Sequence, residues 1–328
     1  MRRTVSAFIV LIVFIGLVLS GCTSPAKEEE LPITIGVLTM GESRNAKFEG
    51  LRQGLSELGL VEPQINFSLF NAYDNEEELE AGAQGLIRQK PDVLVAAGVI
   101  EAEALARNLK GKPVISVVMI GVTFPSSLQA VFSEQGIPTT GVDNGHIELT
   151  GKRMELLRLI FPNRDRFLLV YDPRIKASTL ALQQAQEVAK SNHYNIEPIP
   201  IAGDYDLTKL TKRSFSSKEA MLILPSYYLE SRFREIRNLS LAGRIPVMGL
   251  YDTEAEAGYT ASYGISYFDQ GSQTARLVVR MVKEKRSILF EMPDSVYLKL
   301  NLKAVEQIGE SVSPVGLSFA NKIYTVKE

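Results

Sequence analysis

Few side chains in this sequence have the types and spacing that catalysis or metal binding requires. The only histidines are His146 and His193, and neither belongs to a metal-spaced pair or a His-Glu-x-x-His array. Cys22 is the only cysteine, and no Gly-x-Ser-x-Gly turn presents a nucleophilic serine. No glycine-rich phosphate-binding loop follows an apolar run. We therefore predict a protein that is not an enzyme and holds no metal or cofactor, with His146 structural and His193 on the surface.

Tyrosines, carboxylates and hydroxyls instead gather just after short apolar runs. In an open α/β sheet a ligand binds outside the carboxyl ends of the strands. Aromatic rings beside a few charged groups suit a small organic solute that has both an apolar body and an ionic group, as an amino acid has. The alternative is structural, because a tyrosine at a strand end can simply pack and a serine can cap a helix. The candidate ligand-binding residues are Thr39, Met40, Tyr73, Gly98, Val99, Ile100, Asp143, Asp172, Ser178, Ser226, Tyr227, Tyr251 and Asp252.

The elements that must position these residues follow an alternating pattern. Short apolar runs, which indicate buried strands, alternate with stretches whose apolar residues recur at helical spacing. This alternation is typical of a parallel sheet with crossover helices. In the first half the predicted strands are 33–39, 65–70, 93–98 and 114–119, and the helices are 48–58, 76–89 and 101–111. In the second half the predicted strands are 167–171, 196–201, 220–224 and 247–251, and the helices are 180–191, 207–215 and 230–241.

The two halves repeat one order of elements, which predicts an α/β fold of two doubly wound parallel-sheet lobes joined by a hinge. Residues 140–145 and 263–266 are rich in small residues that can absorb a backbone rotation, as hinge segments must. A helix at 270–284, a strand at 296–300 and a helix from about 302 close the fold. The predicted division is 32–143 plus about 267–300 for one lobe, and 144–266 plus about 301–328 for the other.

The N-terminal segment has the features of export. Arg2 and Arg3 supply positive charge before an unbroken apolar stretch at 7–19. That stretch spans roughly 20 Å as a helix, short of the ~30 Å hydrocarbon core that a transmembrane helix crosses. Leu-Ser-Gly-Cys at 19–22 resembles the lipobox of bacterial lipoproteins, in which the preceding segment is removed and the cysteine is acylated. We expect a signal peptide at 1–21, lipidation of Cys22 and a flexible tether at 22–31.

Six stretches, in their order and spacing, resemble the ABC transporter solute-binding family that includes the tryptophan- and tyrosine-type lipoproteins. They cover nearly the whole exported chain. The stretches are FEGLRQGLSELGL at 48–60, KPDVLVAAG at 90–98, TTGVDN at 139–144, ELLRLIFPNRDRFLLVYDP at 155–173, IPVMGLYDTEAEAG at 245–258 and YLKLNLKAVEQIG at 297–309. The resemblance implies a type I periplasmic-binding-protein-like fold that closes around a small solute. It also implies a lipid-anchored monomer facing the periplasm or exterior, which hands its solute to an ABC permease with a cytoplasmic ATPase.

Two loops depart from the family pattern where the ligand is expected. Gly98-Val99-Ile100 stands where relatives carry Gly-Thr-Pro or Gly-Thr-Ser, which removes a hydroxyl. Pro225-Ser226-Tyr227-Tyr228 stands where they often carry Pro-Thr-Asp-Asn, which removes a carboxylate that could hold an ammonium group. Asp252 keeps the family's acidic position. An aromatic amino acid is what the resemblance implies, and the departures leave the solute open.

Two other functional classes fit parts of the sequence. A receptor that presents the closed form to a membrane signalling partner would need no change in the fold. An exported hydrolase on the same scaffold would need the nucleophile or metal motifs that are missing. Lys and Arg together number 36 against 38 Asp and Glu, a balance that gives no indication of a nucleic-acid partner.

Overall fold

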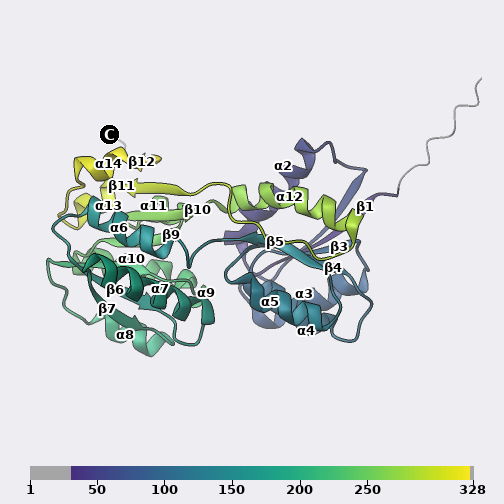
Figure 1. The fold of residues 1–328 in the computed structure, drawn as a ribbon, viewed down its shortest axis with the longest axis horizontal. Helices are drawn as coiled ribbons and strands as arrows, with labels where there is room; N and C mark the ends of the chain where they lie inside the picture. The colour runs from purple at the N-terminus through teal and green to yellow at the C-terminus, as the bar shows by residue number, and fades with distance from the viewer. Residues whose placement is uncertain (1–30, 326–328) are drawn as a thin grey trace, which may run out of the picture. The chain divides into compact units, whose positions relative to one another are not determined.

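Two sheets, each covered by helices, organise the residues that the computed structural model describes, 31–325 (Figure 1). The tertiary contacts group the chain from Ile33 onward into one unit. The predicted signal peptide, the lipidation of Cys22 and all but the last residue of the tether lie outside the described residues.

The first sheet has five parallel strands in the order β2-β1-β3-β4-β5. Its strands are β1 (Ile33–Thr39), β2 (Ile65–Asn71), β3 (Val93–Ala96), β4 (Ser116–Val122) and β5 (Thr139–Asp143). Helices cover both faces, so β3 and β4 are buried along their whole length, which explains their continuous apolar sequence. The first segment predicted as a hinge, 140–145, lies largely within β5, because its small residues pair with β4.

The helices that cover the first sheet include one that returns from late in the chain. The early helices are α2 (Asn45–Glu57), α3 (Glu76–Arg88), α4 (Val99–Leu109) and α5 (Pro125–Glu134), with a 3-10 turn, η1 (Glu42–Arg44), before α2. The later helix, α12 (Tyr267–Glu284), packs against α2 and β4 (Figure 1). Glycines permit this close packing, since a Cβ on Gly271 would lie 1.9 Å from the Lys47 carbonyl oxygen. The five-stranded sheet and these helices are called the first lobe below.

The second sheet repeats this topology and extends it. Its order is β12-β11-β10-β9-β8-β6-β7, so that β7-β6-β8-β9-β10 mirrors the five strands of the first sheet. The strands are β6 (Arg166–Tyr171), β7 (Asn195–Pro200), β8 (Glu219–Ile223), β9 (Val247–Tyr251), β10 (Ala261–Ile265), β11 (Tyr297–Asn301) and β12 (Lys322–Tyr324). The helices are α6 (Thr150–Ile160), α7 (Lys176–Asn192), α8 (Asp204–Thr211), α9 (Tyr227–Ser231), α10 (Phe233–Gly243), α11 (Asp252–Ala257), α13 (Leu302–Gln307) and α14 (Pro314–Ser318). These elements are called the second lobe.

Three details differ from the sequence prediction. The helix predicted at 230–241 is two helices, because Ser226 caps α9 early and the chain bends at Arg232 before α10. The second segment predicted as a hinge, 263–266, overlaps the end of β10. The strand predicted at 296–300 is β11, which pairs antiparallel with β10 in the second sheet, whereas we expected residues up to about 300 to belong to the first lobe.

The chain passes between the sheets three times. It leaves the first sheet after β5, returns after β10 and leaves again before β11. Before the last passage the segment 288–291 runs along β5, where the Glu291 amide donates to the Gly141 carbonyl at 3.0 Å and the Asp143 amide donates to the Glu291 carbonyl at 2.8 Å. We propose that the boundary between the lobes on this return lies between Glu291 and Tyr297.

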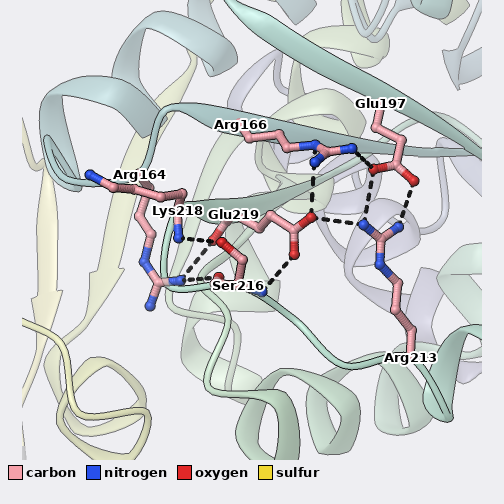
Figure 2. A network of polar contacts seen from close by, with 7 residues as sticks. All are labelled: Arg164, Arg166, Glu197, Arg213, Ser216, Lys218 and Glu219. Carbon is pink, nitrogen blue, oxygen red and sulfur yellow. Dashed lines mark hydrogen bonds and ion pairs between the residues drawn. The ribbon is translucent and has the colours of Figure 1, made fainter.

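A polar network holds the loops at the amino ends of the second sheet's strands (Figure 2). Glu219 is 3% exposed and accepts from Arg213 at 2.7 Å and from the Ser216 amide at 2.8 Å. Arg164, also 3% exposed, donates to the Glu219 carbonyl at 2.9 Å and forms an ion pair with Glu310 at 2.5 Å. These contacts lie at the end of the sheet opposite the strand carboxyl ends, where ligands bind in such sheets. We therefore expect the network to stabilise the second lobe and not to bind a ligand.

Candidate functional site

A cavity of about 330 Å³ lies at the carboxyl ends of strands from both sheets. The first lobe lines it with residues that follow β3 and β4, and the second lobe with residues that follow β6 and β8. Since carboxyl ends are where open α/β sheets bind ligands, this cavity is the candidate site. Its lining is Arg44, Lys47, Gly98, Val99, Ile100, Glu103, Gly121, Thr123, Phe124, Ser127, Asn144, Arg174, Ile175, Lys176, Ala177, Pro225, Ser226, Tyr227, Glu230 and Tyr251.

Six of the residues predicted from the sequence line this cavity: Gly98, Val99, Ile100, Ser226, Tyr227 and Tyr251. The first three form the start of α4, whose N-cap Gly98 has no capping side chain. The backbone N–H groups of that first turn have no partner within the helix and carry the positive end of its dipole. The Ser226 hydroxyl caps α9 by accepting from the Leu229 amide at 3.4 Å, so it has the structural role weighed above while still reaching the cavity.

Three predicted residues in the first lobe and at its edge lie outside the lining. Thr39 is fully buried, and its hydroxyl donates to the Phe70 carbonyl at 3.4 Å. The Met40 amide donates to Glu101 at 2.8 Å. Asp143 accepts from the Gly145 amide at 2.9 Å, and burial raises the pKa of its carboxyl to about 6. These residues lie at strand ends and therefore close to the site, but their polar groups already form hydrogen bonds within the first lobe and its edge.

The other four predicted residues are also engaged elsewhere or point to solvent. Asp172 pairs with Arg174 at 2.8 Å, and its amide donates to the Ser178 hydroxyl at 2.9 Å. Asp252 pairs with Lys299 of β11 at 2.5 Å. Tyr73 is 73% exposed. Asp172 and Ser178 therefore shape the loop that carries Arg174, which does line the cavity.

The sequence reasoning missed charged residues of the cavity lining, among them Arg44, Lys47 and Glu230. Arg44 forms a buried ion pair with Glu101, which is fully buried just behind the lining. A second carboxylate, Glu230 of the second lobe, lies 3.8 Å from the other end of the Arg44 guanidinium. Burial alone would lower the pKa of Arg44, but the charges of Glu101 and Glu230 outweigh it and raise the pKa above its usual value.

Lys47 is the second missed cation, one helical turn after Arg44. Its ammonium donates to the Ala97 carbonyl at 2.7 Å and the Ile120 carbonyl at 3.0 Å, and lies 4.6 Å from the centre of the Tyr267 ring. Burial lowers the pKa of Lys47 to about 7, and the neighbouring Arg44 charge adds to the effect. The amino group is therefore a weak cation that is already committed to backbone carbonyls.

An aromatic chain connects the cavity with the first passage between the lobes. The ring of Tyr251 lies 4.7 Å from that of Tyr267 and 4.8 Å, edge to face, from that of His146. His146 is fully buried, and its Nδ1 lies 3.0 Å from Arg153. Burial and the charges of Arg153 and Lys47 hold the pKa of His146 well below its usual value, so the imidazole is neutral at neutral pH. This geometry agrees with the structural interpretation of His146.

Direct contacts between the lobes surround the cavity. The Tyr227 hydroxyl of α9 donates to Asp74 of the first lobe at 2.9 Å. The Tyr267 hydroxyl of α12 donates to Glu230, also on α9. The short helix α9 is thus the part of the second lobe that contacts the first lobe most directly beside the site.

Within residues 31–325, no group of His, Cys, Asp and Glu side chains is arranged to hold a metal ion. Over the same described part of the chain, the helices are too short or too polar to cross a membrane. A larger surface cavity of about 430 Å³ lies between α2, α12 and the segment 293–297, and β10 is the one described strand whose carboxyl end reaches it, whereas the carboxyl ends of several strands from both sheets meet at the first cavity. The site between the lobes is therefore the one whose position in the fold fits ligand binding.

Comparison with known proteins places this geometry in a class. The fold is that of the type I periplasmic-binding-protein-like proteins, which have two α/β lobes. A conserved domain protein from Vibrio cholerae is 21% identical with a TM-score of 0.75, covering 89% of this chain and 99% of its own. A domain from Streptococcus pneumoniae in complex with L-Trp is 18% identical with the same TM-score and coverage. The ligand-free, open substrate-binding protein CD0873 from Clostridium difficile is 17% identical with a TM-score of 0.66, covering 90% of this chain and 99% of its own.

The family follows from the sequence itself. The family described as ABC transporter substrate binding protein matches residues 32–318, so the chain belongs to that family. No curated protein sequence matches the chain. Family and fold are those of solute-binding proteins and not of enzymes, and they imply a small-molecule ligand, an ABC permease as partner and an extracytoplasmic location.

Proposed function

We propose that this protein captures a small organic solute, an amino acid, between its two lobes and delivers it to an ABC importer. The observation that carries the proposal is the cavity of about 330 Å³ that both lobes line at the carboxyl ends of their strands. Its volume is within the range of small-molecule sites. The complex of the Streptococcus pneumoniae protein with L-Trp supports an amino acid.

The lining of the cavity supports a solute with an apolar body and a carboxylate. Val99, Ile100, Phe124 and Ile175 give an apolar wall. The first-turn N–H groups of α4 suit a carboxylate, because the amino end of a helix attracts anions. Tyrosine rings suit an aromatic or aliphatic side chain. A solute with an apolar side chain and a carboxylate would match these parts of the lining.

Closure by rotation about the passages between the lobes is the proposed mechanism. A solute that contacts both lobes binds the closed form better and so shifts the population towards it. A micromolar solute supplies about 8 kcal/mol in total, part of which orders the lobes. The closed surface, with residues from both lobes, would then dock on the permease. No covalent step is needed.

Lipidation of Cys22 remains part of the proposal. An acylated Cys22 would hold the chain at the membrane while the segment up to Leu31 acts as a tether, and a monomer suffices because one chain supplies both lobes. Labelling cells with a clickable palmitate analogue should label the chain. The variant Cys22→Ala should lose the label and remain uncleaved.

Calorimetry against a panel of solutes tests the proposed function. The panel contains the standard amino acids, simple amines, carboxylates, sugars and polyols, and the full chain is used in detergent. The proposal expects micromolar binding of at least one amino acid. The chain has no tryptophan, so the indole fluorescence of added L-tryptophan reports its own binding. Binding of sugars or polyols without any amino acid would refute the amino-acid assignment, and absence of any ligand would refute the whole proposal.

A further inference from the structure

Glu230 is the only carboxylate that the second lobe contributes to the described lining of the cavity. Its side chain is 18% exposed. One of its oxygens, Oε1, accepts from the Tyr267 hydroxyl. The other, Oε2, lies 3.8 Å from Arg44 Nη2, which is too far for a hydrogen bond. Oε2 therefore keeps its capacity to accept from a group in the cavity.

Two first-lobe cations whose charges act on Glu230, Arg44 and Lys47, are engaged with other groups. Arg44 Nη1 pairs with Glu101, whose side chain is fully buried and also accepts from the Met40 amide. Lys47 donates to two backbone carbonyls, and the pKa of about 7 leaves its amino group only partly charged at neutral pH. Neither cation donates a hydrogen bond to Glu230, so the charge of this carboxylate is only partly compensated from within the protein.

Aromatic rings surround the same point. Tyr227 and Tyr251 line the cavity beside Glu230, and Tyr267 donates to its carboxylate. The electron-rich faces of tyrosine rings attract cations, and Arg44 already lies over the Tyr227 ring at 5.2 Å and Lys47 over the Tyr267 ring at 4.6 Å. A carboxylate beside these rings adds a charge-assisted hydrogen bond to a solute cation. This combination suits an ammonium group better than a neutral hydroxyl or an anion.

We propose that Glu230 is the specificity-determining residue of the cavity and that its carboxylate binds a positively charged group of the solute, such as a primary ammonium. This inference rests on the proposed function and specifies the charge of the solute at one end. Glu230 belongs to the second lobe while Tyr267 and Arg44 belong to the first. A cation held at this carboxylate therefore lies where the lobes meet and favours their closure.

The test uses the full chain and the solute panel above, extended by two analogues of L-tryptophan. Tryptamine keeps the ammonium and lacks the carboxylate, whereas indole-3-propionate keeps the carboxylate and lacks the ammonium. The variants are Glu230→Gln, which keeps the shape and removes the charge, and Glu230→Asp, which keeps the charge. Glu235→Gln is the control, since Glu235 is an exposed residue of the same lobe that does not line the cavity.

The expected result is that every solute bound by the unmodified chain carries a cationic group. A hydrogen bond to a charged group is worth about 1.5–3 kcal/mol, so Glu230→Gln should weaken these solutes by about 10- to 100-fold. Glu230→Asp should recover part of the affinity, and Glu235→Gln should change nothing. Circular dichroism melting confirms that the variants remain folded.

Two outcomes would overturn the inference in different ways. If a neutral or anionic member of the panel binds, and binds equally to Glu230→Gln, the inference fails while solute capture stands. If a cationic solute binds but Glu230→Gln leaves its affinity unchanged, the inference also fails and the proposed function stands. If no member binds at all, both fail.

Discussion

Glu101→Gln tests whether the buried ion pair behind the cavity holds the first lobe together. Glu101 is fully buried, and Arg44 is 5% exposed. The substitution keeps the shape of the side chain and an oxygen that can accept from the Met40 amide, but it removes the charge that faces Arg44. The guanidinium then stays buried with only Glu230, 3.8 Å away, to compensate it.

The size of the effect follows from this geometry. Two unit charges in contact attract by about 4–5 kcal/mol at an effective dielectric constant of about 20. Part of this loss is offset because the carboxylate no longer has to be buried. Breaking a buried pair by removing one partner costs about 3–5 kcal/mol. Because Glu230 remains, we expect the lower end, about 3 kcal/mol.

Urea unfolding followed by far-ultraviolet circular dichroism measures this loss. The matched control is Glu80→Gln, which breaks the pair of Arg107 and Glu80 on the surface, where the side chains are 58% and 37% exposed. That pair should be worth about 0–1 kcal/mol. The double variant Arg44→Met/Glu101→Gln should be more stable than Glu101→Gln alone, because neither position of the pair then buries a charge. Equal losses for Glu101→Gln and Glu80→Gln would refute the reasoning.

Three further predictions concern stability. Folding lowers the pKa of Lys47 from the ordinary 10.5 to about 7. Between pH 7 and pH 10.5 the unfolded state therefore binds more protons than the folded state, and Lys47 makes the free energy of unfolding rise with pH. Lys47→Met should therefore remove a pH dependence of the unfolding free energy of about 1.4 kcal/mol per pH unit in that window. Urea unfolding of the unmodified chain and of the variant, each at several pH values, measures the difference. If the unfolding free energies of the two proteins change in parallel with pH, the prediction is wrong. Gly271→Ala should lower the free energy of unfolding by about 2 kcal/mol or more, because its Cβ would meet the backbone of α2. The control Gly85→Ala in α3 should be neutral or slightly stabilising, because its Cβ would have only Arg88 within 4 Å. Destabilisation by both variants would contradict the packing described. Glu219→Gln should lower stability by about 2–3 kcal/mol through the network in Figure 2, and an unchanged unfolding midpoint would show that the network contributes nothing.

Most of the fold was predictable because local patterns and topology agree. Short continuous apolar runs such as 93–96, between Pro91 and Gly98, are typical of strands buried on both faces, and the helices between them show one apolar face. The strand β5 was missed because its sequence, TTGVD, has the small residues of a hinge and pairs only through long-range contacts. The end of the first lobe was also misplaced, since nothing local in 297–301 says which sheet the strand joins.

The candidate site was predictable only in part. Strand-end reasoning correctly predicted that Gly98, Ser226 and Tyr251 line the cavity, because each ends a strand or follows one within three residues. Arg44, Lys47 and Glu230 were missed because they lie further along the turn or helix that follows the strand. The available signal was helical spacing, since Glu230 follows Tyr227 by three residues and Lys47 follows Arg44 by three.

The carboxylates show why residue type alone is a weak guide. Asp172 and Asp252 have the strand-end positions expected of ligand contacts, yet Arg174 and Lys299 neutralise them. Lys299 is distant in sequence from Asp252, so that pair could not be predicted. Arg174 is close in sequence to Asp172, but proximity alone does not show that the two side chains pair. Glu230 differs because its hydrogen-bonding partner is a tyrosine and its nearest cation is already paired.

The distance between the lobes, measured with and without solute, tests the central claim most directly. The full chain with Cys22→Ser has no other cysteine, so Ala130→Cys on α5 and Gln183→Cys on α7 place one spin label on an exposed position of each lobe. Double electron–electron resonance should give a shorter and narrower distance distribution when a solute that binds in calorimetry is added at saturation. An unchanged distribution at saturation would contradict capture by closure of the lobes.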